Sequence, residues 1–500
     1  MVVRRTFVLV SLVGMLGATM AMGHTRMRDV DAAPPSPTPA HEPDVSIAEA
    51  EPAATPKTST PEQPNRPVYD APLVGPDPAP LRVVGLGWEI LAPGILANDG
   101  ATPGPSSHFE EVGLTVTFDA VTDVEDLQRR LGRGGHDEAG ADIALLPYPE
   151  FVAAYERLRA LSPQVFFVVG WSRGRDVVLA ERPDALQRPV GKDVVLEGAP
   201  GRASTLLGLF ALDRAGVPMQ HVTLHEPAPA SDGSPRARRS TTLQAVQRSH
   251  ANPSALDARK LVLSTAEATH LVPIVAVAPA GQLERRHAAM VAWSRGWLHG
   301  VDMVHADPTH AARRVAESEH APEVVDLIDG LGWIAFASVG DNARMSGLAG
   351  RSALHLDTLF ARTWDLWRSV GVLTTPAPEL APLRTEVVAE VAVRDDGRHH
   401  AAPERTDTVP RASAQPLLVV PLELDLSDMA AEHDLQTEMA FLAAVFSRSE
   451  LRLAIARNPR AAQRLATRAR ERHGLRQDRI VTERRPRAKT TATVAVMPVR

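Results

Sequence analysis

A polar Ser-Arg-Gly-Arg-Asp segment separates two apolar runs in VVGWSRGRDVVLA, which covers 168–180. The flanking runs are typical of buried β-strands, so the polar residues stand between two strands. Arg173 offers a planar fork of N–H donors that suits a carboxylate or another oxyanion, and Ser172 adds a hydroxyl group. In the structural alternative, Arg173 and Asp176 pair with each other and stabilise the connection. These residue types therefore predict either an oxyanion site or an internal ion pair.

A second candidate for oxyanion binding is GAPGRAST, which covers 198–205 and precedes a strongly helical run. The first N–H groups of a helix have no partner within the helix, so they can hold an anion together with the hydroxyls of Ser204 and Thr205. Ordinary N-capping by Ser204 or Thr205 is the structural alternative. A capping residue can also contact a ligand, so the two interpretations are compatible.

The composition argues against several other kinds of chemistry. The 500 residues include no cysteine, so the chain has no disulfide, thiolate metal site or cysteine nucleophile. The histidines at 287–310, which are His287, His299, His305 and His310, follow no tight metal-ligand spacing. We therefore expect no metal site and no other cofactor. We expect no enzyme, because GWSRG lacks the Gly-x-Ser-x-Gly spacing of a hydrolase nucleophile. The net charge of −6 argues against a nucleic-acid partner.

The N-terminal residues have the features of an export signal. Arg4 and Arg5 precede an apolar stretch from 7 to about 20, and small residues follow it. We predict a signal peptide at 1–23, with an uncleaved membrane anchor as the alternative. No later stretch is long and apolar enough to cross a bilayer, so we expect the mature chain outside the cytoplasm.

Low-complexity sequence divides the remainder of the chain. Residues 24–80 are rich in Pro, Ala, Ser, Thr and Glu and cannot bury enough apolar surface to fold, and a second linker covers 394–416. Between them, 81–393 alternates strand-like and helix-like runs, which predicts doubly wound α/β sheets with ligands beyond the carboxyl ends of the strands. We expect strands at 81–87, 113–118, 141–147, 164–171, 176–180 and 192–198. A short C-terminal unit covers 417–500.

Residues 284–306 predict a helix with a buried apolar stripe. The stripe is formed at helical spacing by Met290, Trp293, Trp297, Val301 and Val304. We interpret both tryptophans as core residues, with ligand contact as the alternative. Asp307 and Pro308 are then expected to begin the next helix as its N-cap and first residue.

The order of pieces over 81–393 resembles the solute-binding proteins of ABC importers for nitrate, alkanesulfonate and taurine, a family that includes binders of thiamine-pyrimidine precursors. The matching segments include FEEVGLTVTF, ADIALLP, VFFVVGWSRGRDVVLA and VGKDVVLEGAPGRASTLLGLFALDRAGV. The resemblance implies a type II periplasmic-binding-protein fold. Lobe 1 would cover about 81–171 and 275–393, lobe 2 would cover about 176–270, and crossing strands would join them.

The resemblance also implies a function. An exported protein of the periplasm or cell envelope would capture a small, anionic solute by hinge closure, with an ABC permease as its partner. Trp88 and Tyr148 follow strand ends at the expected cleft, where Trp88 would stack on a flat solute or, alternatively, be buried against a helix. The candidates for ligand contact are Trp88, Tyr148, Ser172, Arg173, Asp176, Ser204, Thr205, Ser264 and Thr265.

The C-terminal unit resembles an OmpA-like domain, as in a fused subgroup of the same family. LVVPLELDLSD, QTEMAFLAAVFSRS and LRLAIAR match its first strand, first helix and next strand. The Asp with which that domain family holds peptidoglycan is absent from IARNPR, and Arg460 or Arg464 stands near the position of its Arg. We therefore expect a degenerate domain with weak or no cell-wall contact.

A second departure lies within the binding domain. Residues 234–261 are polar and lack the Trp-Glu-Pro-like segment that relatives carry at the cleft. This departure favours an alternative function, in which the chain is a structural or scaffolding protein of the envelope that kept the fold and lost its ligand.

Overall fold

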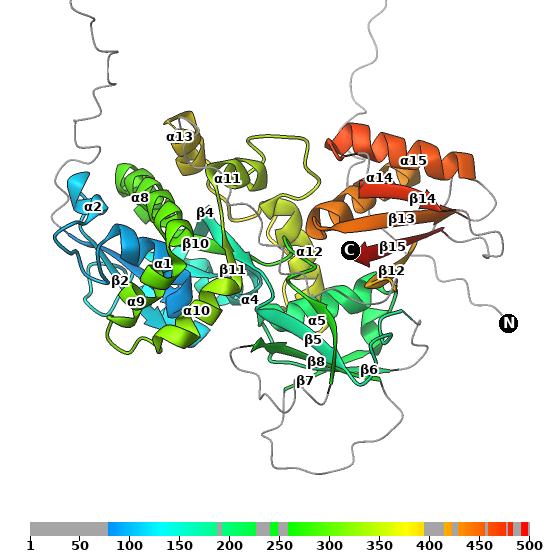
Figure 1. Cartoon of the computed structure of the whole chain (residues 1–500), viewed down its shortest axis with the longest axis horizontal. Helices are drawn as coiled ribbons and strands as arrows, with labels where there is room; N and C mark the ends of the chain where they lie inside the picture. The colour runs from blue at the N-terminus through cyan, green and yellow to red at the C-terminus, as the bar shows by residue number, and fades with distance from the viewer. Residues whose placement is uncertain are drawn as a thin grey trace, which may run out of the picture. The chain divides into compact units, whose positions relative to one another are not determined.

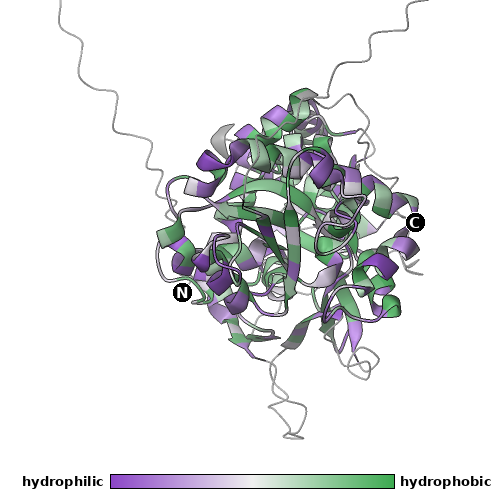
Figure 2. Ribbon diagram, turned by 90° about the vertical axis from the view of Figure 1, so that its left-hand side faces the viewer, coloured by the Kyte–Doolittle hydropathy of each residue, from purple (hydrophilic) through white to green (hydrophobic). Residues whose placement is uncertain are grey.

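The computed structural model describes residues 79–187, 193–226, 241–248, 259–394, 415–422, 429–455, 459–476, 479–483 and 492–498. The predicted signal peptide, and most of both predicted linkers, lie outside these residues. Three β-sheets of six, five and four strands are found in the described part (Figure 1). Figure 2 shows that hydrophobic residues concentrate in the strands, as expected for sheets covered by helices.

The six-stranded sheet forms lobe 1, in the order β11-β4-β10-β3-β1-β2. Its strands are β1 (Leu81–Leu86), β2 (Val116–Val121), β3 (Ile143–Pro147), β4 (Pro163–Ser172), β10 (Pro273–Pro279) and β11 (Ile334–Phe336). Strand β1 is parallel to β2 and β3, as βαβ units require. Strand β10 is antiparallel to β3 and β4, because β4 leads the chain out of the lobe and β10 brings it back.

The five-stranded sheet forms lobe 2, in the order β7-β6-β8-β5-β9. Its strands are β5 (Asp176–Ala180), β6 (Val194–Glu197), β7 (Val222–His225), β8 (Thr241–Gln247) and β9 (Lys260–Ser264). The chain passes between the sheets twice, from β4 to β5 and from β9 to β10. We call residues 173–175 the first crossing and 265–272 the return crossing. The predicted α/β fold of two lobes joined by crossing strands is confirmed.

Helices cover the sheet of lobe 1. In the described residues before lobe 2, these helices include α1 (Trp88–Ala97), α2 (His108–Glu111), α3 (Val124–Arg133) and α4 (Tyr148–Leu158). Those after it are α7 (Ala280–Arg285), α8 (His287–Ala306), α9 (Pro308–Ala316), α10 (Val324–Gly332), α11 (Val339–Met345), α12 (Leu356–Ser369) and α13 (Glu386–Arg394). Lobe 2 carries α5 (Ala203–Arg214).

The predicted core stripe of α8 is confirmed. Trp293 and Trp297 are fully buried, and their rings pack against each other with centroids 5.3 Å apart. The predicted start of α9 is also confirmed, because the Asp307 carboxylate accepts from the His310 N–H at 2.9 Å and Pro308 is the first helical residue.

The strand predicted at 113–118 is wrong in position, since β2 begins at Val116. Gly113 has a φ of 79° and donates its N–H to the carbonyl of Glu110, which ends the turn after α2. The Leu114 N–H then donates to the carbonyl of Phe109. These turn hydrogen bonds occupy the residues that the apolar pattern assigned to the strand.

The C-terminal unit is a four-stranded sheet with two helices, in the order β12-β15-β13-β14. Its elements are β12 (Leu418–Leu422), α14 (Met429–Val445), β13 (Ser449–Ile455), α15 (Pro459–His473), β14 (Ile480–Glu483) and β15 (Ala492–Pro498). Strand β15, which was not predicted, lies between β12 and β13 and pairs antiparallel with both. Helix α15 ends at His473, because Gly474 adopts a φ of 64°.

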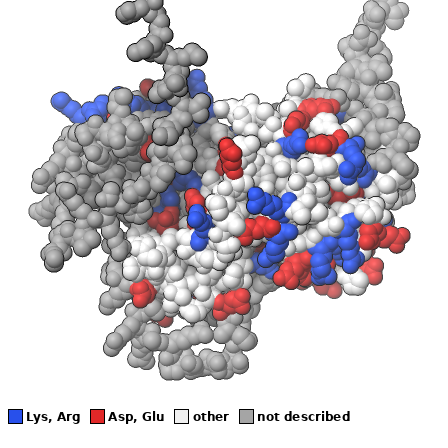
Figure 3. Space-filling view, turned by 180° about the vertical axis from the view of Figure 1, so that it is seen from behind, with Lys and Arg blue, Asp and Glu red and all other residues white. Residues whose placement is uncertain are grey.

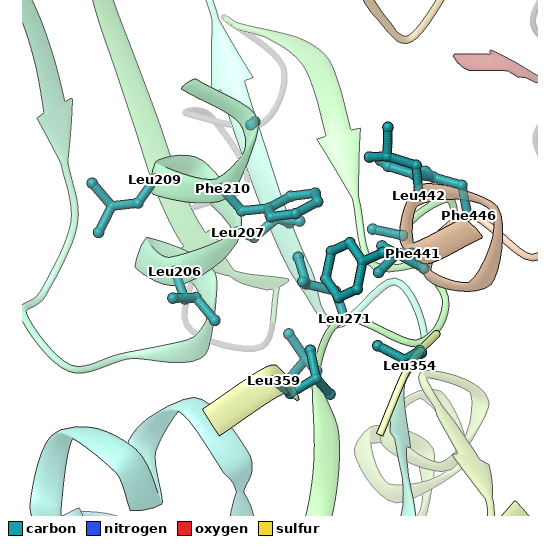
Figure 4. Packing of buried hydrophobic residues seen from close by; sticks show 14 of the residues in the cluster. Leu206, Leu207, Leu209, Phe210, Leu271, Leu354, Leu359, Phe441, Leu442 and Phe446 are labelled. Atoms are coloured by element: carbon teal, nitrogen blue, oxygen red, sulfur yellow. The ribbon is translucent and has the colours of Figure 1, made fainter. Parts of the chain in front are cut away.

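Helix α14 packs on lobe 2 (Figure 4). The ring of Phe210 on α5 lies 6.4 Å from Phe441 and 6.2 Å from Phe446, measured between centroids. The carboxylate of Glu438 pairs with Arg214 of α5 and with Arg362 of α12, the latter at 2.8 Å. One hydrophobic cluster therefore joins residues of lobe 2, α12 and the C-terminal unit.

Basic and acidic side chains are interspersed on the face shown in Figure 3. Ion pairs on the surface of lobe 1 include Arg384 with Glu284 at 2.9 Å and Arg130 with Asp126 at 3.5 Å. Exposed pairs of this kind contribute little stability individually. They do, however, break up areas of single charge on this lobe.

Candidate functional site

The two crossings are tied together by a buried set of hydrogen bonds, which we call the crossing node: Ser172, Gly174, Asp176 and Thr265. The Thr265 hydroxyl oxygen accepts from the backbone N–H of Gly174 at 2.8 Å and of Asp176 at 3.3 Å. The Ser172 hydroxyl donates to the Asp176 carboxylate at 2.6 Å and lies 2.8 Å from the Thr265 hydroxyl. All three polar side chains are buried. The node therefore fixes where each crossing leaves its sheet.

Local sequence explains the sharp first crossing. Gly174 has a φ of 91°, a conformation that costs residues with a side chain but not glycine. The preceding N–H of Arg173 donates to the carbonyl of Trp333 at 2.7 Å, so the pairing of β4 with β11 extends to the last residue before the turn. Lobe 1 thus holds the chain firmly up to the glycine.

Two ion pairs connect the lobes beside the crossing node. Arg175 of the first crossing lies 2.8 Å from the carboxylate of Glu89, and Arg202 before α5 lies 3.2 Å from the carboxylate of Glu150. We call these the interlobe ion pairs. The N–H of Ala203, at the start of α5, also points to the Glu150 carboxylate at 3.4 Å.

The sheet of lobe 1 brings both glutamates to the same edge. Strands β1 and β3 are parallel neighbours, and α1 and α4 begin directly after them. Glu89 and Glu150 stand in the first turns of these two helices, where the helix dipole favours negative charge. This is the edge at which α/β sheets hold ligands, and here it presents two carboxylates to two guanidinium groups.

Burial changes the acidity of this region. Burial raises the pKa of Glu150, although Arg202 and Arg175 act to lower it. Burial also raises the pKa of Asp176, against the lowering effect of Arg175 and of the Ser172 hydrogen bond. Both carboxyl groups are therefore easier to protonate than exposed ones, and each depends on arginine to stay charged.

The structure does not bring all predicted residues to this junction. Trp88 begins α1 with its side chain in the hydrophobic core of lobe 1. Tyr148 begins α4, and its hydroxyl donates to the carbonyl of Leu356 at 2.9 Å while its ring packs against Phe151. Ligand contact for Trp88 and Tyr148 stays a prediction, and any such contact requires a different orientation of these side chains.

The predicted capping of α5 by Ser204 or Thr205 is wrong. The N-cap is Arg202, which makes no side-chain capping bond, and both predicted residues lie inside the helix. The Thr205 hydroxyl instead donates to the carbonyl of Ala199 at 2.7 Å and closes the preceding loop. A carboxylate from the other lobe, that of Glu150, faces the helix N-terminus in place of a cap.

The return crossing is bound to the C-terminal unit. The His270 ring nitrogen Nδ1 lies 3.0 Å from the carbonyl of Ala444, and its ring stands edge-on to Trp171 with centroids 5.1 Å apart. The Thr269 hydroxyl contacts the carbonyl of Val445 at 3.2 Å. Ser264, at the end of β9, donates its backbone N–H to Glu267 at 2.9 Å. The end of α14 therefore supports this crossing.

Replacing His270 with asparagine is expected to reduce the acid sensitivity of the fold. Burial lowers the pKa of His270 to about 4, so between about pH 6.5 and 4 the unfolded chain binds a proton that the folded chain does not. Stability should thus fall as the pH falls through this window, by on the order of 3 kcal/mol. Urea unfolding at pH 7 and pH 4.5 measures the loss, which should be smaller in His270→Asn.

The original protein and His270→Asn both contain Glu150 and Asp176, so these two carboxyl groups contribute equally to the pH dependence of each. Their raised pKa values act in the opposite direction, because a carboxyl group with a raised pKa stabilises the fold as the pH falls. Equal losses of stability in the original protein and in His270→Asn would contradict the assignment to His270.

Within the described residues, no group of three or more His, Asp or Glu side chains is placed to hold a metal ion. No helix among them is long and apolar enough to span a membrane.

No sequence-family model matches the chain, and no curated protein matches it in sequence. Solved structures do resemble it. The ligand-binding component of an ABC-type import system from Staphylococcus aureus, described with zinc bound, is 12% identical with a TM-score of 0.42, over 63% of this chain and 99% of that one. The periplasmic aliphatic sulphonate-binding protein of Escherichia coli is 13% identical with a TM-score of 0.43, over 60% and 96%.

The periplasmic nitrate-binding protein of Synechocystis is 13% identical with a TM-score of 0.36, over 50% of this chain and 69% of that one. The two-lobed architecture itself rests on this chain's own strand order and its two crossings.

Proposed function

We propose that the chain is an exported solute-binding protein that captures a small anionic solute between its lobes by hinge closure, for ABC-type uptake or sensing. The observation that carries the proposal is the pair of arginines, Arg175 and Arg202, that face carboxylates across the junction of the lobes. Arginine forms the same two-pronged hydrogen bonds with a solute carboxylate or sulfonate as with a glutamate. A solute anion would therefore replace Glu89 or Glu150 as the partner of an arginine.

The crossing node supports hinge closure. Ser172, Asp176 and Thr265 use their polar atoms on one another and so hold the two crossings together, and the interlobe ion pairs join the lobes beside them. Hinge closure turns on a few residues at the ends of elements, and the crossings lie at the ends of β4, β5, β9 and β10. In this proposal the predicted residues of the node position the arginines, and the arginines bind the solute.

A thermal-shift screen tests the proposal. The intact chain is heated with nitrate, taurine, methanesulfonate, phosphonates and pyrimidines at millimolar concentration. A solute at about 100 times its Kd should stabilise the fold by about 2.7 kcal/mol. The shift should be lost in Arg175→Gln and Arg202→Gln but kept in Arg182→Gln, whose arginine lies in lobe 2, is 62% exposed and pairs with Asp184. Absence of a shift with every solute would overturn the proposal.

The scaffold alternative is favoured by a specific observation. The charges of the interlobe ion pairs already satisfy one another, and the end of α14 holds the return crossing, so contacts within the chain are sufficient to hold the lobes together. In a scaffold, these pairs serve only to fasten the lobes.

Glu89→Gln separates the two functions. If Arg175 binds a solute, removing the competing carboxylate should raise the affinity for the anion several-fold, although the free protein becomes less stable. If the chain is a scaffold, the variant loses stability and gains no ligand. Calorimetric titration with the solute that gives the largest thermal shift measures the difference.

We further propose that the chain is exported to the periplasm, that an ABC permease is its partner, and that its C-terminal unit is a degenerate OmpA-like domain. Arg460 and Arg464 on α15 are exposed, and residues 456–458, where the family's Asp is missing, lie outside the described residues. A pull-down on purified peptidoglycan should retain the chain weakly or not at all.

A further inference from the structure

A cavity of about 380 Å³ lies on the C-terminal side of the crossings, away from the interlobe ion pairs. We call it the Trp171 cavity. Its walls come from Trp171 and His270, from α11 and the loop after it, from α14, and from the turn after α15. Its volume falls in the range of small-molecule sites in proteins.

The charged side chains that line the cavity are basic. Three arginines line it, at positions 344, 351 and 479, while none of the described lining residues is Asp or Glu. The guanidinium of Arg479 donates to the carbonyls of Ala443 and Phe446 at the end of α14. Arg344 pairs with Asp341 at 2.7 Å, and Arg351 makes one long hydrogen bond, 3.5 Å, to the carbonyl of Glu471. The cavity thus favours negative charge, and Arg351 has N–H groups to offer.

Two buried ring nitrogens of the wall lack a hydrogen-bond partner. The Nε1–H of Trp171 is one, on a side chain that is 3% exposed, and Nε2 of His473 is the other. A buried donor without an acceptor costs free energy, which a ligand oxygen would recover. Apolar side chains also line the cavity, among them Met345, Leu354 and Ala443.

We infer that the Trp171 cavity is a second binding site, for a small amphipathic anion: a carboxylate or sulfonate carried on a ring or short alkyl chain. The anionic group is held by Arg351 and the Trp171 N–H, and the apolar part lies against the apolar wall. Because both the return crossing and α14 line the cavity, such a ligand fastens the C-terminal unit to the crossings. This site does not depend on solute binding between the lobes.

Calorimetric titration of the full chain with naphthalene-2-sulfonate and with octanoate tests the inference and distinguishes aromatic from aliphatic anions. The neutral naphthalene-2-methanol and the cationic naphthylmethylammonium are the comparison probes. At least one anion is expected to bind at least tenfold more tightly than either comparison probe. Equal binding of the neutral probe, or no binding of either anion at millimolar concentration, would overturn the inference.

Variants locate the site. Arg351 is exposed, so Arg351→Gln should leave the fold intact and weaken anion binding about tenfold. Trp171→Phe removes only the N–H and the second ring, and should weaken binding several-fold. Arg313→Gln, an exposed arginine on α9 outside the cavity, is the matched control and should change nothing.

One further variant separates this site from the proposed solute site. Arg175→Gln should leave the binding of the naphthalene or octanoate probe unchanged, since Arg175 does not line the cavity. Loss of binding in Arg175→Gln, with retention in Arg351→Gln, would assign the probe to the interlobe junction and refute the second site.

Discussion

Gly300→Ala is expected to destabilise the fold by about 3 kcal/mol or more. Helices α1 and α8 cross at Gly300, where an added Cβ would overlap the backbone carbonyl of Pro93. Backbone cannot move aside as a flexible side chain can, so the two helices must separate. Since α1 carries Glu89 in its first turn, the displacement should also weaken the interlobe ion pair with Arg175.

Gly132→Ala is the matched control for this experiment. Gly132 lies inside α3 with open space around the position of its missing Cβ. The same substitution there should stabilise the helix by about 0.5 to 1 kcal/mol, because alanine has the higher helix propensity. Urea unfolding of both variants measures the change in the free energy of unfolding. A Gly300→Ala midpoint equal to that of the original protein would show that α1 and α8 leave room for a methyl group at Gly300.

Asn342→Leu should cost on the order of 3 to 5 kcal/mol, because it leaves several buried backbone groups without partners. The Asn342 side chain is fully buried on α11. Its amide accepts from the Val168 N–H at 2.7 Å and donates to the Val168 carbonyl at 2.8 Å and to the Ser338 carbonyl at 3.1 Å. It thereby continues the pairing along β4 beyond the short strand β11.

Gln128→Leu provides the comparison for Asn342→Leu. The Gln128 side chain accepts an exposed hydrogen bond from Arg157 at 3.0 Å, so its loss should cost less than about 1 kcal/mol. The free energy of unfolding of both variants is measured by chemical denaturation. A similar small loss in the two variants would mean that water or a shifted backbone replaces the Asn342 amide.

Hydrophobic patterning made most strands of the two lobes predictable. The apolar runs at 164–171 and 176–180 correspond to β4 and β5 within one residue. Strands buried on both faces have little polar alternation, and a run bounded by glycine and charged residues marks them clearly. Strand β15 was not predicted, because its position between β12 and β13 in the sheet depends on pairing with segments that are distant in sequence.

The interlobe ion pairs could not be predicted from the sequence patterns. Glu89 and Glu150 each follow a lobe 1 strand, and acidic residues are common in first helical turns for reasons of the helix dipole alone. Their partners, Arg175 and Arg202, belong to the crossing and the other lobe, so only the folded arrangement reveals the pairing. A usable signal did exist, since both glutamates stand at the carboxyl ends of strands predicted to be parallel.

The orientation of the Trp88 side chain could not be predicted from the sequence, for a different reason. Its position directly after β1 was predictable, but α1 is buried on almost all sides, with Glu89 as its exception. A helix without a polar face has no periodicity that tells which residues point to a cleft and which to the core. Contact between Trp88 and a solute therefore stays a prediction.

The packing of Phe210 against Phe441 and Phe446 has a consequence for biosynthesis. Translation completes α5 well before the ribosome reaches α14, so the apolar surface around Phe210 stays uncovered in the nascent chain until α14 emerges. Prematurely terminated copies keep that surface open to aggregation and to chaperones. A copy that ends before α14 therefore exposes an apolar helix face that α14 otherwise covers.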